Sequence, residues 1–232
     1  QMCIRDRTDG TADALESLHV SIKVTTGDGT WLTSKSLHAA QASIDEPFDV
    51  MLWQSSDVTI FHDTYQRIEE YRSQYPSSLL VAQLAVSENG EISSGGYYIE
   101  RGARFRYQRI QAEKLPTDID TFDGDLVLIP ATVVRNVGSI NGGLHHPFES
   151  YDFGLRAIRK GVRCLALPGN FGTRALPPNP VIKTRGDGLR YLRGTQGSLF
   201  KNQLKFFAKH GGWRWPLYFT MPYIRILLNK SP

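Results

Sequence analysis

The chain has 232 residues, of which 41% are hydrophobic and 11% aromatic, enough apolar material for a sizeable core, so we expect a globular protein. Its two cysteines, Cys3 and Cys164, are too few for a disulfide framework or a thiolate metal site. The sequence shows no charged-then-apolar signal segment and no apolar run near the roughly 20 residues that span a bilayer, so we expect a cytoplasmic protein.

The formal net charge of +4 is distributed unevenly along the chain. Residues 181–232 carry ten Lys or Arg and one acid, a net charge of +9. The preceding residues therefore hold 17 basic and 22 acidic residues, a net charge of −5. This division predicts an acidic body that binds cations and a basic tail that meets an anionic partner.

The first residues of the chain fit no regular element. Residues 1–7 show neither strand alternation nor a start methionine, and we interpret them as foreign or damaged sequence. They run directly into the turn at 8–11, Thr-Asp-Gly-Thr, which ought to follow a buried strand. We therefore expect that the first strands of the domain are missing. The elements expected next are a helix at 8–18, a strand at 20–25 and a helix at 33–43.

Strands and helices alternate in the middle of the chain. We expect apolar strands at 48–53, 79–86, 126–130 and 162–167, helices at 62–75 and 151–160, and a loop or hairpin in the arginine-rich stretch before residue 121. This alternation predicts an α/β fold with a mostly parallel central sheet flanked by helices. The proline-rich segment 177–180 is typical of a linker, so we divide the chain into a body at 8–180 and a basic, aromatic-rich helical extension at 181–232.

The first candidate site residue is Asp57, which ends the polar run after the strand at 48–53. An acid at the carboxyl end of a parallel strand faces the crevice where open α/β sheets bind ligands. Mg²⁺ needs only one or two carboxylates when diphosphate oxygens and waters complete its octahedron. An isolated aspartate more often caps the next turn, so the metal-binding role of Asp57 depends on the motifs around it.

The second candidate is an acidic pair, Glu149 and Asp152, at the start of the helix expected near 151. The helix dipole favours negative charge there, which is a sufficient structural explanation for Glu149. His145 and His146 precede the pair and can orient a base or bind a metal, although loop histidines are more often simply exposed. By itself this cluster leaves its role open.

The motifs, taken together and in order, resemble the bacterial family 2 glycosyltransferases, which have the GT-A nucleotide-sugar fold. The resemblance runs from residue 8 to the carboxyl end, and its tail is similar to a subgroup that builds surface polysaccharides. The matching segments are 8–11, 48–57, 121–130, 146–156 and 160–163. The resemblance implies an inverting hexosyl- or deoxyhexosyltransferase that uses Mg²⁺ or Mn²⁺. Such an enzyme moves a sugar from a nucleotide-sugar donor to a hydroxyl of a cell-surface glycan or lipid-linked acceptor.

The same resemblance implies a role for each candidate residue. Asp57 would hold the metal, and Glu149, with Asp152 as second choice, would act as the catalytic base. Turn formation explains Gly95, Gly96 and Gly124 at least as well as a position near the donor does. Arg156 can instead form an ion pair with Asp152, one helical turn earlier. The residues implied to lie near the donor are Asp9, Gly95, Gly96, Gly124, Asp125, His146 and Arg156.

Three serines depart from the family pattern. Ser55 and Ser56 stand where the metal motif usually has acids or amides, and Ser150 replaces the aspartate that most often acts as base. We therefore keep a second hypothesis, in which the chain is a degenerate, non-catalytic member that binds a sugar nucleotide or a partner enzyme.

The basic tail has two explanations of nearly equal weight. Its cations and aromatic residues between 198 and 228 predict docking on an anionic membrane surface, at the inner face of the plasma membrane. Alternatively, the aromatic residues pack on the acidic body, while the cations cover its surface or contact the donor diphosphate. We expect no nucleic-acid partner, because these aromatic residues cluster with apolar residues instead of punctuating a polar, basic strand.

Overall fold

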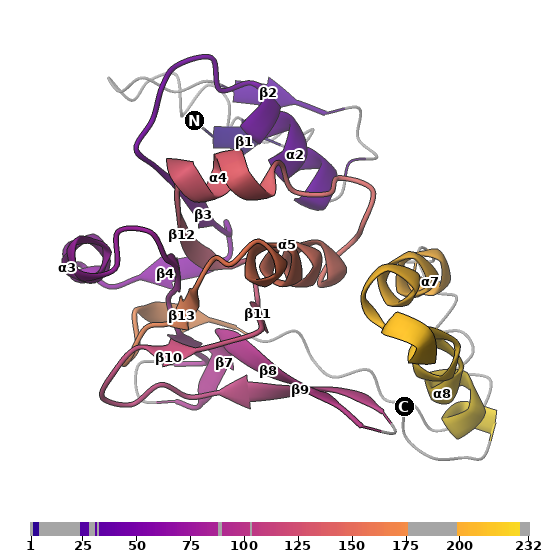
Figure 1. The fold of residues 1–232 in the computed structure, drawn as a ribbon. Coiled ribbons are helices and arrows are strands. Elements are labelled where there is room, and N and C mark those ends of the chain that lie inside the picture. Colours follow the sequence, from indigo (N-terminus) through magenta and orange to yellow (C-terminus); the bar gives the residue numbers. More distant parts are fainter. Residues whose placement is uncertain are drawn as a thin grey trace.

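The computed structural model describes residues 2–4, 24–27, 31, 33–87, 90–102, 104–175 and 199–227. These residues form a mixed α/β protein in which helices pack on both sides of a central sheet (Figure 1). The candidate Asp9 and the linker at 177–180 lie outside the described residues. No helix among the described residues is long and apolar enough to cross a membrane.

The central sheet has five strands and mixed directions. Its order is β10 (Thr117–Asp118), β13 (Cys164–Ala166), β5 (Leu79–Val81), β12 (Leu126–Pro130) and β3 (Val50–Gln54). The pair β13 and β5 is parallel, whereas β12 runs antiparallel to both of its neighbours. The prediction of a mostly parallel sheet is therefore corrected. Short strands, not a crossover helix, connect β5 to β12, so the chain returns to the sheet in the opposite direction.

Two smaller sheets continue the fold beside the central one. One contains β11 (Thr121–Phe122) and the hairpin of β8 (Gly96–Arg101) and β9 (Phe105–Ile110), which is the arginine-rich stretch. The other has the order β4 (Val58–Ile60), β14 (Gly172–Arg174), β6 (Leu84–Ala85) and β7 (Ile92–Ser94). The single strand expected at 79–86 is thus two short strands, β5 and β6, in different sheets.

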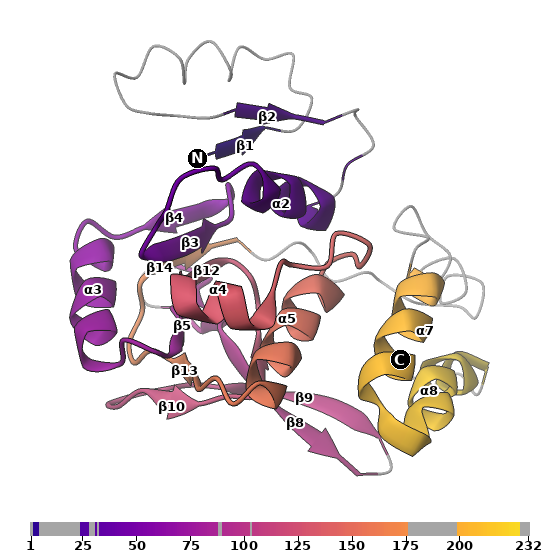
Figure 2. The same cartoon turned by 45° about the horizontal axis from the view of Figure 1, so that its top comes forward.

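A further strand pair lies near the amino-terminal end of the described chain. Met2–Ile4 forms β1, which pairs in parallel with β2 (Val24–Thr26), although residues 1–7 give no strand signal in the sequence. Both strands lie beside α2 (Thr33–Ala42) (Figure 2).

The apolar runs of the sequence bury both faces of the central sheet. Leu79 and Val81 pack on one face with Phe153 of α5 (Phe148–Arg159), beside α4 (Ala131–Val137). Leu80 packs on the other face with Ile68 of α3 (Thr64–Gln74). Because side chains alternate along a strand, a strand covered on both faces must be apolar at every position. This is why β5 and β12 read as continuous hydrophobic segments.

The carboxyl-terminal helices share a core with the body. They are α7 (Leu199–His210), the 3₁₀ turn η1 (Gly212–Arg214) and α8 (Trp215–Leu227). Buried side chains from α7 and α8 pack against α5 and the β8–β9 hairpin, and the set includes Phe206, Phe207, Tyr218, Phe148, Tyr151 and Tyr97. Trp213, in contrast, is 84% exposed. The buried aromatic residues of α7 and α8 therefore pack on the body of the protein, as one of the two explanations of the tail predicts. Trp213 instead faces solvent.

Candidate functional site

A cavity of about 450 Å³ lies where β3 ends and β12 begins. The antiparallel register pairs Gln54 with Leu126, and the Ser55 N–H donates to the Asp125 carbonyl at 2.8 Å. The polar residues after β3 and before β12 therefore meet at one edge of the sheet. The lining of this cavity includes the charged and hydrogen-bonding side chains of Asp57, Asp125, His146, Glu149, Arg174 and Asn202.

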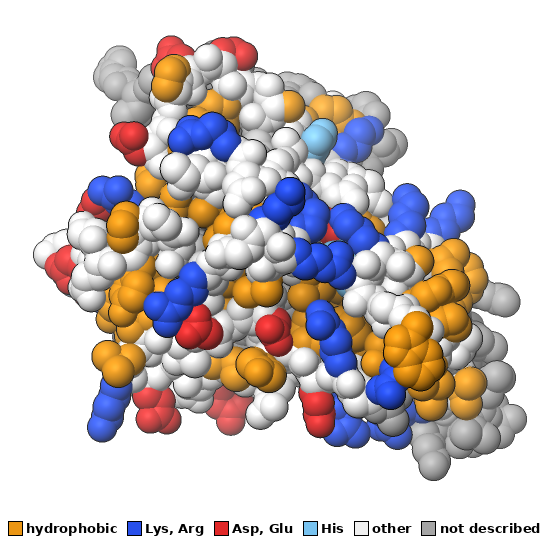
Figure 3. All heavy atoms as spheres, viewed as in Figure 1, with side chains coloured by type: hydrophobic (Ala, Val, Ile, Leu, Met, Phe, Trp, Pro, Cys, Tyr) orange, Lys and Arg blue, Asp and Glu red, His pale blue; other side chains and the backbone are white. Residues whose placement is uncertain are grey.

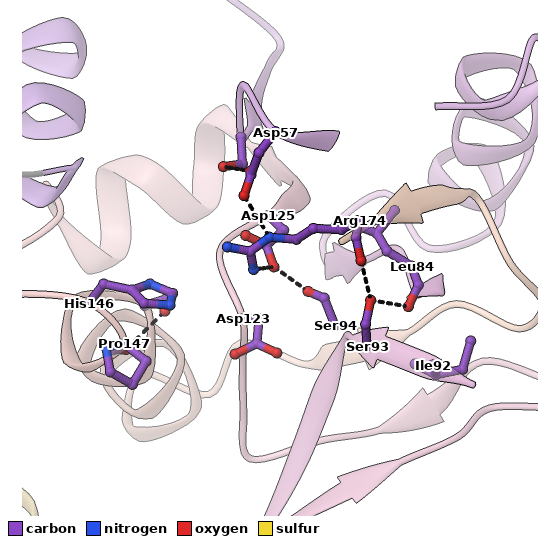
Figure 4. Close-up of polar contacts among 12 residues, drawn as sticks. Asp57, Leu84, Ile92, Ser93, Ser94, Asp123, Asp125, His146, Pro147 and Arg174 are labelled. Carbon is purple, nitrogen blue, oxygen red and sulfur yellow. Dashed lines mark hydrogen bonds and ion pairs between the residues drawn. The ribbon is translucent and has the colours of Figure 1, made fainter. Parts of the chain in front are cut away.

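Arg174, on β14, joins two of these carboxylates (Figure 4). Its Nε donates to Asp57 Oδ2 at 3.0 Å, and its Nη1 donates to Asp125 Oδ2 at 2.5 Å. The register of β14 pairs Arg174 with Val58, directly after Asp57. Sequence reasoning missed Arg174, because nothing local marks a residue whose partners lie 117 and 49 positions away.

The two carboxylates bonded to Arg174 also accept serine hydroxyls. Ser55 Oγ donates to Asp57 Oδ1 at 2.6 Å, and Ser94 Oγ donates to Asp125 Oδ2 at 2.5 Å. Partial burial alone would raise the pKa of Asp57, but the bonds from Ser55 and Arg174 outweigh it and lower that pKa. The Asp57 carboxylate is therefore ionised at neutral pH.

Glu149 lies in the first turn of α5 and faces the cavity. It is 4% exposed, and its Oε1 lies 3.2 Å from Nδ1 of His146. This hydrogen bond raises the pKa of His146. Among the described residues, Oε2 of Glu149 has no hydrogen-bond partner. A buried carboxylate oxygen without a hydrogen-bond donor is costly to keep, so a bound group that donates to it would relieve this cost.

Asp152, one helical turn after Glu149, does not line this cavity. Its carboxylate is fully buried and accepts hydrogen bonds from Arg156 Nε at 2.8 Å, Lys209 Nζ at 2.6 Å and His210 Nε2 at 2.7 Å. Burial would raise the pKa of Asp152, but these three donors together hold it well below its usual range. Arg156 likewise lies away from the cavity and donates to the Val137 carbonyl.

The candidate glycines divide into two groups. Gly124 lines the cavity, and a Cβ there would lie 3.2 Å from Cβ of Ser150, so the glycine lets the loop before β12 approach α5. Gly95 and Gly96 do not line the cavity. A Cβ on Gly96 would lie 2.5 Å from Ile119, which shows that its small size serves packing.

Asp123 lies beside the cavity without lining it. The Tyr97 hydroxyl donates to its Oδ2 at 2.8 Å, and Arg109 Nη2 lies 3.8 Å from the same oxygen. Burial raises the pKa of Asp123 to about 6, against the lowering effect of the Tyr97 hydrogen bond. Asp123 therefore faces the β8–β9 hairpin, and Asp125 is the aspartate of this loop that faces the cavity.

The oxygens around Arg174 fit a hard divalent cation that is shared with phosphates. Asp57, Asp125 and the Ser55 hydroxyl surround one positive group, the guanidinium, and Mg²⁺ or Mn²⁺ prefers such oxygen ligands. Within the described residues, no group of three His, Cys, Asp or Glu is placed to hold a metal. A cation at this position would therefore take one or two ligands from the described residues, and phosphate oxygens and waters would have to complete the coordination.

No protein-family model and no curated protein matches the chain. Several solved structures do. One is GalNAc-T7 with UDP, GalNAc and Mn²⁺, which has a TM-score of 0.54 and 13% identity over 97% of this chain and 47% of that one. A second is S. aureus TarS 1–349 in complex with UDP-GlcNAc, with a TM-score of 0.57 and 12% identity over 97% of this chain and 71% of that one.

A third match is the mannosyltransferase PcManGT from Pyrobaculum calidifontis in complex with GDP-Man and Mn²⁺. Its TM-score is 0.52, with 11% identity over 99% of this chain and 78% of that one. This chain spans only 47% of the GalNAc-T7 structure and 36% of another, longer TarS structure. At these identities the similarity is one of fold. The chain has the GT-A fold of nucleotide-sugar glycosyltransferases.

Proposed function

We propose that the chain is an inverting glycosyltransferase of the family 2 type, which moves a hexosyl or deoxyhexosyl group from a nucleotide-sugar donor to a glycan or lipid-linked acceptor. The observation that supports this most strongly is the free Oε2 of Glu149 in the same cavity as the cluster of Asp57, Asp125 and Arg174. One part of the cavity thus offers a proton acceptor, and the other offers groups that suit a diphosphate and its cation.

The proposed reaction is a direct displacement. Glu149 Oε2 takes the proton of the acceptor hydroxyl, while the hydroxyl oxygen forms a bond to the anomeric carbon. The bond from that carbon to the diphosphate oxygen breaks, and its electron pair leaves with the diphosphate. Attack from the face opposite the leaving group inverts the configuration. A divalent cation bound by Asp57 and Asp125 would supply Lewis-acid stabilisation of the leaving diphosphate.

His146 and Ser150 are proposed to position the base. His146 binds Oε1 of Glu149, and Oε2 has no hydrogen-bond partner among the described residues. Ser150 lines the cavity beside Glu149, and its hydroxyl donates to the Pro147 carbonyl at 3.0 Å. The family usually has the aspartate that acts as base at the position of Ser150. Here the Ser150 hydroxyl donates to the backbone, so the neighbouring carboxylate of Glu149 is the better candidate for the base.

The test of this function starts with nucleotide binding by the full chain. Calorimetry with UDP, GDP, dTDP and CDP, with and without Mn²⁺, is expected to detect binding of one nucleotide. The matching nucleotide-sugars are then assayed for release of that nucleotide by transfer or hydrolysis. Binding without turnover would instead support the non-catalytic hypothesis, and no binding to any of the four would contradict both.

Asp57→Asn is expected to abolish the gain in nucleoside diphosphate affinity that Mn²⁺ provides. Asp57 is the only carboxylate in the segment 54–57, so no neighbour in that segment replaces it as a ligand. Calorimetry with and without Mn²⁺ measures the gain. Asp63→Asn, which changes an acid paired with Arg67 on α3, is the matched control. An unchanged Mn²⁺-dependent gain in the Asp57 variant would refute its assignment as a ligand.

We also propose that the outer face of α7 and α8 docks on an anionic membrane surface. Large hydrophobic side chains stay exposed over these helices, namely Phe200, Trp213, Leu217 and Ile224 (Figure 3). Lys201 and Lys205 are exposed on α7. Each Lys or Arg near an anionic surface contributes about 1 kcal/mol, and tryptophan favours the membrane interface. Docking would bring the cavity to a lipid-linked acceptor at the inner face of the plasma membrane.

Trp213→Ser is expected to weaken adsorption of the full chain to anionic vesicles several-fold, because it removes the most exposed aromatic side chain of this face. Co-sedimentation with phosphatidylglycerol-containing vesicles at low and high salt measures this adsorption. Leu115→Ser is the matched control, since Leu115 is 74% exposed in the loop before β10. If the unmodified chain ignores anionic vesicles at low salt, the proposed docking is wrong.

A further inference from the structure

We propose that Arg174 makes the binding of a divalent cation and of a diphosphate interdependent: the cation takes Asp57 from Arg174, and the released guanidinium then binds the diphosphate. This inference rests on the proposed function, because it takes the cavity to be the donor site. It assigns to Arg174 a binding role that neither the sequence motifs nor the fold comparison supplies.

Carboxylates outnumber Lys and Arg side chains in the cavity lining. Among the described residues that line it, Arg174 is the only Lys or Arg, whereas Asp57, Asp125 and Glu149 contribute three carboxylates. A diphosphate that entered the cavity without a cation would be repelled by these carboxylates. The guanidinium of Arg174 could not offset this repulsion, because it is already bonded to Asp57 and Asp125. Guanidinium groups bind phosphates strongly through paired N–H donors, so releasing Arg174 from one carboxylate adds a phosphate-binding group where it is needed.

The two ion pairs of Arg174 differ in exposure to solvent. The Asp125 side chain is 5% exposed, and its Oδ2 also accepts a hydrogen bond from the Ser94 hydroxyl. The Asp57 side chain is 54% exposed. Exposed ion pairs contribute little because water screens them, whereas a buried pair resists separation. The ion pair between Arg174 and Asp57 is therefore the one that breaks, while the ion pair with Asp125 keeps the guanidinium at the cavity.

Repulsion between like charges links the cation, Arg174 and the diphosphate. A divalent cation on Asp57 would lie beside the guanidinium, and the two repel each other until an anion separates them. A diphosphate provides that anion and gives Arg174 a new partner. Each ligand therefore favours the other, and by thermodynamic linkage both affinities change by the same factor. The cation alone must compete with Arg174 for Asp57 and binds weakly.

Arg174→Gln is expected to change the two affinities in opposite directions. The variant should bind Mn²⁺ alone about two- to fivefold more tightly, the factor that corresponds to breaking one exposed ion pair. It should bind the nucleoside diphosphate, with Mn²⁺ present, on the order of tenfold to a hundredfold more weakly, because a charged hydrogen-bond donor is lost. Electron paramagnetic resonance of free Mn²⁺ measures the first affinity, and calorimetry measures the second. A merely structural defect would weaken both.

Two further variants complete the test. Arg174→Lys keeps the charge but lacks the two separate nitrogens that donate to Asp57 and Asp125, so it should also bind Mn²⁺ more tightly and should lose less diphosphate affinity than the glutamine variant. Arg163→Gln is the matched control, because Arg163 pairs with Asp118 on the surface away from the cavity. The inference is overturned if neither Arg174 variant binds Mn²⁺ more tightly than the unmodified chain. A chain that binds no nucleotide under any condition would instead contradict the proposed function itself.

Discussion

Glu149→Gln is expected to lower turnover by roughly 10²- to 10⁴-fold and to leave donor binding unchanged, since this is the usual contribution of a positioned general base. The amide keeps the size of the side chain and an oxygen that can face His146. It has no carboxylate oxygen to accept the proton that Oε2 is proposed to receive. Single-turnover rates and calorimetric donor affinity, measured on the same sample, separate the chemical step from binding.

The matched control for this variant is Glu69→Gln, since Glu69 pairs with Arg72 on the exposed side of α3. It should leave both turnover and binding unchanged. Native turnover in the Glu149 variant would remove Glu149 as the base. If Asp152→Asn lowered turnover to the same extent at unchanged stability, the base would be Asp152, the second carboxylate of α5.

Asp152→Asn is expected to destabilise the protein by about 3 kcal/mol, within the range for breaking a buried ion pair by removal of one partner. Arg156 and Lys209 would keep their charges but lose the carboxylate that both contact. Lys209 is 42% exposed and can turn toward water, so the loss should be near the lower limit of that range. Urea unfolding at pH 7 measures it. Asp118→Asn, at an exposed pair, should cost less than about 1 kcal/mol.

The stabilising effect of Asp152 should also depend on pH. Its pKa in the folded protein lies well below its usual value, so between the two pKa values the unfolded chain binds more protons than the folded one. Stability from this group is therefore fully present above the unfolded pKa and is lost as the pH falls through the folded one. The difference between wild type and Asp152→Asn should shrink below about pH 4. A difference that is constant down to pH 2 would contradict this explanation.

The sequence predicted the buried elements well because they carry strong local patterns. The strand at 126–130 has the predicted bounds, and α3 and α2 lie within two residues of theirs. These segments are determined by hydrophobic periodicity, which a single sequence contains. The direction of β12 is different, because it depends on how the intervening strands return the chain to the sheet. The predicted parallel sheet was wrong for that reason.

The candidate site was predicted only where a residue belongs to a local motif. Asp57 and Glu149 come from segments with a recognisable order, and both line the same cavity. Spacing alone could not separate Glu149 from Asp152, since the partners that occupy Asp152 come from α7, more than fifty residues later. Arg174 and Asn202 carry no local signal at all, and only the tertiary fold brings them to the cavity.

The position of α7 bears on where the chain can be divided. We proposed a body at 8–180 and an extension at 181–232, yet α7 covers Phe148, Tyr151 and Leu155 on the outer side of α5 and contributes Asn202 to the cavity wall. A protein that ended at residue 180 would expose these apolar side chains to water as a hydrophobic patch that favours aggregation. Its cavity would also lack the wall that Asn202 provides. α7 thus covers part of the hydrophobic core, and the shortest segment that can be expressed or exchanged with this core and cavity intact includes α7.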